Sequence, residues 1–282
     1  MGLLLQLLLT GIAIGCGYAL LATGFVFIHR VTRVVNFAQG GFAVIAGFVT
    51  YSALAAGLPH GVSEVLAVLA AALVGLVVGV LIIGLRDTPP LAALIMTIGV
   101  GFCLWALEVA VWGDQPLQFE GLGGVFAVAG VSIQYQYALI VAVTAATFAL
   151  LALFFGHSYL GKVFTACASN PYAARLAGID VRRVGIIAFA LGGGLGGLAG
   201  VLLLSLRSLT FDSDVDLSIN GFAAAIFGGL QRPWLALVGG VVLGIFEQLI
   251  AGYSRASYQK AVSLFVILAI LVWRAARRRE QT

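Results

Sequence analysis

Long apolar runs without a charged side chain decide what this chain can fold into. Residues 1–28, 65–85 and 185–206 hold no Asp, Glu, Lys or Arg, and a helix needs about 20 apolar residues to span a bilayer. Charged residues make up only 9% of the 282, against about 25% in a soluble domain. The chain is therefore a polytopic membrane protein, and soluble enzymes, disordered chains and disulfide-stapled secreted domains are excluded.

The runs predict an all-α fold in a single transmembrane domain covering residues 1–282. A β-barrel is excluded, because its strands alternate over about ten residues. Residues 1–28 are too long for a signal-peptide core and lack a basic start, so we expect a retained first helix. The half-length run 217–230 is expected to be a short or broken segment, which gives eight passages without it and nine with it. The full-length spans are expected at 1–28, 36–58, 65–85, 91–112, 135–155, 185–206, 235–252 and 261–273.

The basic residues predict the orientation, because Lys and Arg are concentrated in cytoplasmic loops. With the tail at 274–279 in the cytoplasm, twelve of the fifteen lie inside and only Arg207, Arg255 and Lys260 outside. The N-terminus is then outside and the C-terminus cytoplasmic. This alternation requires the run 217–230 to return the chain to the cytoplasmic side.

Two stretches imitate nucleotide-binding motifs. Residues 156–163 match the start of a Walker A loop, but Val163 stands where a Ser or Thr must bind Mg²⁺. The pattern Gly192-x-Gly194-x-x-Gly197 lies inside an apolar span rather than after a strand. We interpret it as part of small-residue ridges that let membrane helices approach closely.

The sequence offers no catalytic, cofactor or metal site. The three histidines lie in three different connectors, and the only carboxylates inside apolar runs are Glu108 and Glu247. No nucleophile with a base, paired carboxylates or histidine cluster is present. The cysteines are far apart and form no ligand-like pair; they are Cys16, Cys103 and Cys167. The chain is not expected to be an enzyme.

The segment 157–184 is the longest polar stretch on the predicted cytoplasmic side. Small residues recur through it, and Asn170-Pro171 marks a turn or helix start. Two short helices ending at Gly178 are expected. From the residues alone, the segment is either a docking element for a soluble partner or an ordinary amphipathic connector.

Several motifs in this chain resemble those of the branched-chain amino acid class of ABC permeases, and they cover nearly its whole length. The first is Gly17-Tyr18-Ala19-Leu20 followed by Gly24, and the second is Asn36-Phe37-Ala38-Gln39-Gly40-Gly41. The third runs from Ala224 to Leu230 and continues with Gly239-Gly240 and Gly244-x-x-Glu247. The segment 157–184 resembles the family's cytoplasmic ATPase-coupling loop. The residues that match it are Gly161, Lys162, Ala166, Ala168, Asn170, Ala173, Ala174, Leu176 and Gly178.

The resemblance implies a permease subunit of an ABC importer in the bacterial inner membrane. Its solutes would be branched-chain amino acids or related small polar molecules such as amides, urea or small organic acids. The implied partners are a second, related permease subunit in a heterodimer, two ATPases that bind ATP and Mg²⁺, and a periplasmic or extracellular solute-binding protein. Membrane lipids surround the chain, and nucleic acid is not a partner. The loop departs from the family at Thr165 and Lys162, where arginine is usual.

Polar groups at membrane depth are candidates for the solute path, because they are costly unless they face a cavity or a partner. They are Asn36, Gln39, Asn220 and Glu247. Gly40 is a further candidate, because a helix broken at its glycine-rich stretch would line a cavity with free backbone groups. Asn36 and Gln39 have helix capping as an equal alternative, and Glu247 favours an interhelical hydrogen bond over contact with solute.

Two other classes remain possible at this stage. A stand-alone secondary transporter would need buried ionisable groups for ion coupling, and the chain has few. A non-transporting structural subunit would have no use for the small-residue loop at 157–184.

Overall fold

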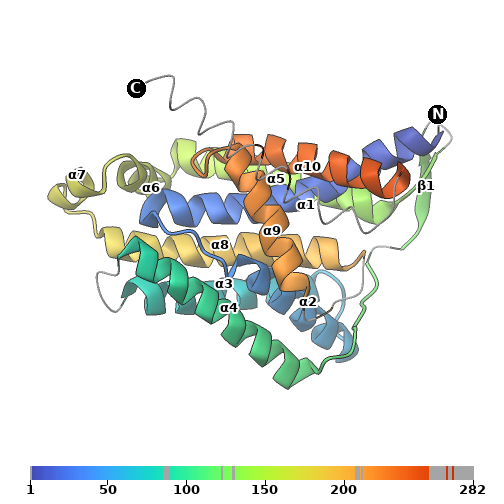
Figure 1. Cartoon of the computed structure of the whole chain (residues 1–282), viewed down its shortest axis with the longest axis horizontal. Helices are drawn as coiled ribbons and strands as arrows, with labels where there is room; N and C mark the ends of the chain where they lie inside the picture. The colour runs from blue at the N-terminus through green and yellow to red at the C-terminus, as the bar shows by residue number, and fades with distance from the viewer. Residues whose placement is uncertain are drawn as a thin grey trace.

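The chain forms a bundle of helices (Figure 1), seen in a computed structural model that describes residues 2–84, 89–121, 123–128, 131–206, 210, 212–253, 265 and 269. The first helices are α1 (Gly2–Thr32), α2 (Gln39–Ala55), α3 (Val62–Gly79) with its π-helical extension η1 (Val80–Gly84), and α4 (Pro90–Trp112). The strands β1 (Val125–Val128) and β2 (Val131–Gln134) precede α5 (Tyr135–His157), α6 (Tyr159–Ser169) and α7 (Pro171–Leu176). The last helices are α8 (Val181–Leu204), α9 (Ser213–Phe227) and α10 (Pro233–Tyr253).

Within the described residues, six helices are long and apolar enough to cross a membrane, which confirms the polytopic α-helical prediction. They are α1, α3 together with η1, α4, α5, α8 and α10. The helices α2 and α9 are shorter, with 17 and 15 residues. The predicted span 261–273 and the C-terminal tail lie outside the described residues, apart from Phe265 and Ala269.

Helix α1 lies inside the bundle from about Gly11 onward and is enclosed there by its neighbours. Its glycines permit this, because they let α10 approach backbone to backbone. A Cβ on Gly15 would lie 2.6 Å from the carbonyl oxygen of Gly240, and a Cβ on Gly240 would lie 2.6 Å from that of Gly15. Close approach of this kind is the usual role of small residues between membrane helices.

Helix α8 carries two glycine ridges that face different neighbours. A Cβ on Gly193 would lie 2.5 Å from the carbonyl oxygen of Ala71 on α3, and one on Gly197 would lie 2.5 Å from the Ala71 Cβ. On another side, a Cβ on Gly200 would overlap the backbone of Ala43 on α2. These contacts confirm that the glycine pattern serves helix packing.

The two ends of the bundle differ in character. The helices α6 and α7 project at one end, on the left of Figure 1, and the N-terminus and β1 lie at the other. The end of α1 lies at the α6–α7 end, because Arg33 donates to the carbonyl oxygen of Ala168 at 3.0 Å. The turn between α9 and α10 is there too, with Nδ1 of His29 3.2 Å from the carbonyl oxygen of Leu230.

The short run predicted at 217–230 is the continuous helix α9, which crosses the bundle obliquely (Figure 1). Fifteen residues span about 22 Å, less than the hydrocarbon core. Because α9 begins beside the start of α2 rather than at the bundle's edge, this length still brings the chain to the α6–α7 end. The return required by the predicted alternation is therefore present.

A small antiparallel hairpin departs from the all-α expectation. Val125 pairs with Gln134 and Val128 with Val131, in the polar connector between α4 and α5. The β-branched and aromatic residues of Val125–Val128 favour extended backbone, but four residues were too few to stand out among 20-residue apolar runs.

Candidate functional site

The polar segment 157–184 folds into two short helices, as predicted. Ser158 caps α6 by accepting from the Gly161 amide at 2.8 Å. Asn170 caps α7 by accepting from the amides of Tyr172 at 3.0 Å and Ala173 at 3.1 Å, which are bonds typical of an N-cap residue.

Gly178 ends α7 and allows the turn into α8. Its φ of +81° lies in the left-handed region, where glycine carries no steric penalty. The Ile179 amide donates to the carbonyl oxygen of Ala174 at 3.0 Å. Helix α8 then begins at Val181, so the connector ends at Asp180 and is four residues shorter than predicted.

The residues predicted for the coupling loop divide between two faces. Gly161 and Ala174 point inward, and Ala174 packs with Phe164, Cys167 and Val181. Ala168 is half-buried, and its carbonyl oxygen binds Arg33. The remaining predicted residues are exposed and, with Tyr172, form what we call the outer face: Lys162, Ala166, Asn170, Tyr172, Ala173, Leu176 and Gly178. Tyr172 and Leu176 are 70% and 74% exposed.

Three of the predicted path residues meet where α2 begins. Asn36 accepts from the Ala38 amide at 3.2 Å and lies 3.5 Å from Oε1 of Gln39. Gln39 donates to the carbonyl oxygen of Gly192 on α8 at 2.8 Å, and both side chains are fully buried. The bond between Asn36 and the Ala38 amide is a local capping contact. The bond between Gln39 and Gly192 joins α2 to α8.

The amide of Gly40 donates to Oγ of Ser218 at 2.9 Å, which joins the start of α2 to α9. Asn220 lies two residues further along α9, is 8% exposed and has a hydrogen-bonding or electrostatic partner of its own. The structure therefore brings the α2 residues close to the region of α9 that contains Asn220.

Glu247 lies apart from this group. It follows Gly244, which packs against Gly11 and Gly15 of α1, whereas Gln39 packs against Gly24. At 1.5 Å per residue, these levels differ by about 15 Å along α1. Glu247 is buried and has a hydrogen-bonding or electrostatic partner, and its role in an interhelical hydrogen bond stays a prediction.

Glu108 of α4 is a buried carboxyl group to which the sequence analysis gave no role. Its side chain is fully buried, and neither oxygen has a hydrogen-bond partner among the described residues. It lies within electrostatic reach of Asp214 at the start of α9. A single carboxylate in the run 91–112 was the available signal, but nothing in the sequence placed it beside Asp214.

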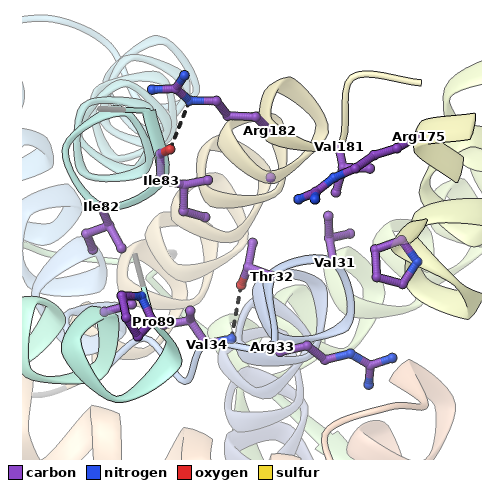
Figure 2. A pocket seen from close by; sticks show the side chains of 13 residues that line it. Val31, Thr32, Arg33, Val34, Ile82, Ile83, Pro89, Arg175, Val181 and Arg182 are labelled. Carbon is purple, nitrogen blue, oxygen red and sulfur yellow. Dashed lines mark hydrogen bonds between the residues drawn. The ribbon is translucent and has the colours of Figure 1, made fainter. Parts of the chain in front are cut away.

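Nowhere in the described part of the chain do three or more His, Cys, Asp or Glu side chains come together as a metal site would require. The structure does form two sizeable cavities at the α6–α7 end, which no sequence motif indicated. One contains Arg30 and Arg232, and the other contains Arg33, Arg175 and Arg182 (Figure 2).

Similar proteins extend over nearly the whole chain. It is 28% identical over 285 residues to the high-affinity branched-chain amino acid transport system permease protein LivH of Escherichia coli (strain K12), covering 95% of this chain and 92% of that protein. It is 29% identical to the probable branched-chain amino acid transport permease protein LivH of Methanocaldococcus jannaschii, covering 90% and 85%.

A solved structure shares the fold. PsaBC from Streptococcus pneumoniae in complex with Fab includes a chain that matches with a TM-score of 0.51 and 13% identity, covering 96% of this chain and 91% of that one. The family described as branched-chain amino acid transport system / permease component matches residues 7–271. The chain therefore belongs to the branched-chain amino acid transport system permease component family.

Proposed function

We propose that this chain is a permease subunit of an ABC importer for branched-chain amino acids or related small polar solutes. As a member of a permease family, it is a transport component and not an enzyme. The proposal adds the partners: a second permease subunit, two ATPases that supply the energy, and a solute-binding protein. ATP and Mg²⁺ would be bound by the ATPases.

The outer face of α6–α7 is the observation that carries this proposal. It combines small residues with two exposed, apolar side chains, Tyr172 and Leu176. Exposed apolar side chains that lie together on one face favour a protein interface, and both helices are at one end of the bundle (Figure 1). We infer that this face docks on an ATPase and transmits its motion to α8.

The region around Asn36, Gln39, Gly40 and Asn220 supports an accompanying proposal about the path. The region is buried in the bundle at the start of α2. Helix α9 packs against the start of α2 there. Helices that begin inside a membrane bundle are typical of transporter binding sites. We propose that a change in the packing of α9 opens the solute path beside these residues.

The charges support an orientation in the inner membrane. Seven Lys and Arg residues are described, and all lie at the α6–α7 end: Arg30, Arg33, Lys162, Arg175, Arg182, Arg183 and Arg232. Because basic residues are concentrated on the cytoplasmic side, we propose that this end is cytoplasmic and that the N-terminus is outside.

Cysteine labelling tests this orientation. In a chain without its natural cysteines, Ser169→Cys at the end of α6 should resist an impermeant thiol reagent added to intact cells, and Gln115→Cys beyond α4 should react. Both positions are exposed, so the membrane alone decides the difference. Permeabilised cells should label at both positions, and labelling of Ser169→Cys alone in intact cells would contradict the orientation.

Reconstitution tests the function. Vesicles that contain this chain, its partner permease and the two ATPases should take up leucine only when the solute-binding protein and ATP are both supplied. The chain alone should neither hydrolyse ATP nor accumulate solute. Uptake by the isolated chain, driven by an ion gradient, would contradict the proposal and establish a secondary transporter.

A further inference from the structure

A basic cavity of about 440 Å³ lies at the α6–α7 end, between the coupling helices and the membrane helices. Its walls come from the end of α1, from η1, from the start of α4, from α7 and from the first turns of α8. It thus joins the connector that contains α7 to helices that lie in the membrane. The outer face, which would dock on an ATPase, is a different surface.

Three arginines from three separate segments line this cavity, and among the residues that the structure describes no Asp or Glu lines it. In Figure 2, Arg175 extends from α7 toward the middle of the cavity, and Arg33 and Arg182 lie at its edges. Arg33 uses one donor on the carbonyl oxygen of Ala168, and Arg182 donates Nε to that of Ile83 at 3.0 Å. The guanidinium group of Arg175 has no hydrogen-bond or ion-pair partner within the described ranges.

Most of the donors of these guanidinium groups are therefore unused. A guanidinium group has five N–H donors in a planar fork that matches the oxygens of a phosphate. The first turn of α8 lies at the same cavity, but Asp180 already caps it by accepting from the Arg183 amide at 3.1 Å, so the arginines supply the attraction for an anion. The cavity is thus suited to a phosphate group.

The surroundings of the cavity favour a lipid as the source of that phosphate. Apolar side chains that include Val34, Ile82 and Ile83 form much of its wall. On the neighbouring surface, Leu81 of η1 and Leu91 of α4 are 45% and 71% exposed, as expected of side chains that face acyl chains. Basic pockets between membrane helices are known to bind anionic headgroups.

We propose that this cavity binds the phosphate of an anionic phospholipid, with Arg175, Arg182 and Arg33 around the headgroup and the acyl chains along η1 and α4. Such a lipid would connect α7 to the membrane helices. The position of the coupling helices would then depend on the lipid composition of the membrane.

The test uses the full-length chain, purified and placed in phosphatidylcholine nanodiscs with a small fraction of phosphatidylglycerol. Native mass spectrometry reports how much phosphatidylglycerol each variant retains. Arg175→Gln and Arg182→Gln should each weaken retention about tenfold, the loss expected when one charge-assisted bond is removed. Arg183→Gln is the matched control, because the neighbouring Arg183 does not line the cavity and instead pairs with Asp180 at 2.9 Å.

Two further arms separate charge from shape and lipid from free anion. Arg175→Lys keeps the positive charge and should recover most of the retention, whereas a purely structural role of the guanidinium would not be rescued. Inorganic phosphate added in excess should not displace phosphatidylglycerol. Equal loss in Arg183→Gln, or full retention in both cavity variants, would overturn the site. Displacement by inorganic phosphate would overturn the lipid as its ligand.

Discussion

Replacing Leu176 with aspartate is expected to lower solute uptake at least about tenfold without affecting membrane insertion. Leu176 is 74% exposed on the outer face of α6–α7, so the change leaves the core of this chain intact. If an ATPase covers Leu176, a carboxylate there would be buried without a partner, at a cost of several kcal/mol. Uptake in reconstituted vesicles and co-purification of the ATPase measure the effect.

Val125→Asp is the matched control for ATPase co-purification. Val125 is also apolar and is 62% exposed, but it lies on β1 at the opposite end of the bundle (Figure 1). The Val125 variant should retain the ATPase and the Leu176 variant should lose it. Equal retention by both would show that the outer face is not the docking surface.

The same reasoning advises against Ala174 as a probe of docking. Ala174 is only 4% exposed and packs with Phe164 and Cys167 of α6. A large substitution there would disturb the packing of α7 on α6 before any partner is considered. Its small size is explained by contacts within this chain.

Gly193→Ala should destabilise the protein by about 1–3 kcal/mol, the usual cost of overpacking, whereas Gly194→Ala should not. The added Cβ would lie 2.5 Å from the carbonyl oxygen of Ala71 at position 193, but 3.6 Å from the Ala72 Cβ at position 194. The two substitutions are chemically identical and differ only in the side of α8 that they alter. Thermal unfolding in detergent should therefore show a lower Tm for the first variant alone.

An equal Tm for both variants would mean that α3 and α8 are not packed as closely as described. If only Gly194→Ala lowered the Tm, the side of α8 that packs tightly against α3 would be the one with Gly194, not the one with Gly193. Alanine is also the better helix former of the two residues, so an open position should gain slightly from the change.

The apolar runs predicted most of the helices because each span must fill the bilayer with apolar side chains. The helices α3 with its extension η1, α4 and α5 begin and end within about three residues of the prediction. Helix α8 begins at Val181 rather than at 185, because Arg182 and Arg183 can extend from its first turn into water. The charge-free criterion therefore began the predicted span too late.

The sites were less predictable, because they are formed by tertiary packing. Asn36 and Gln39 are close in sequence and could be grouped from it, but the bond from Gln39 to Gly192 joins segments more than 150 residues apart. The cavity arginines lie at 33, 175 and 182, in three segments that no sequence pattern connects. A buried carboxyl such as Glu108 stands out in an apolar run, but its neighbour Asp214 follows only from the fold.

The enclosed position of α1 has a consequence for biosynthesis. Its main neighbours α8 and α10 begin at Val181 and Pro233, so the ribosome makes them long after α1 has entered the membrane. At about 5–20 residues per second, α1 waits on the order of ten seconds or more for these partners. During that interval, the surface of α1 that is later buried in protein faces lipid. Charged side chains on that surface would be costly there. The requirement explains why Gly2–Ile28 carries no charged side chain on any face, although the part from Gly15 to Ile28 is finally buried by protein.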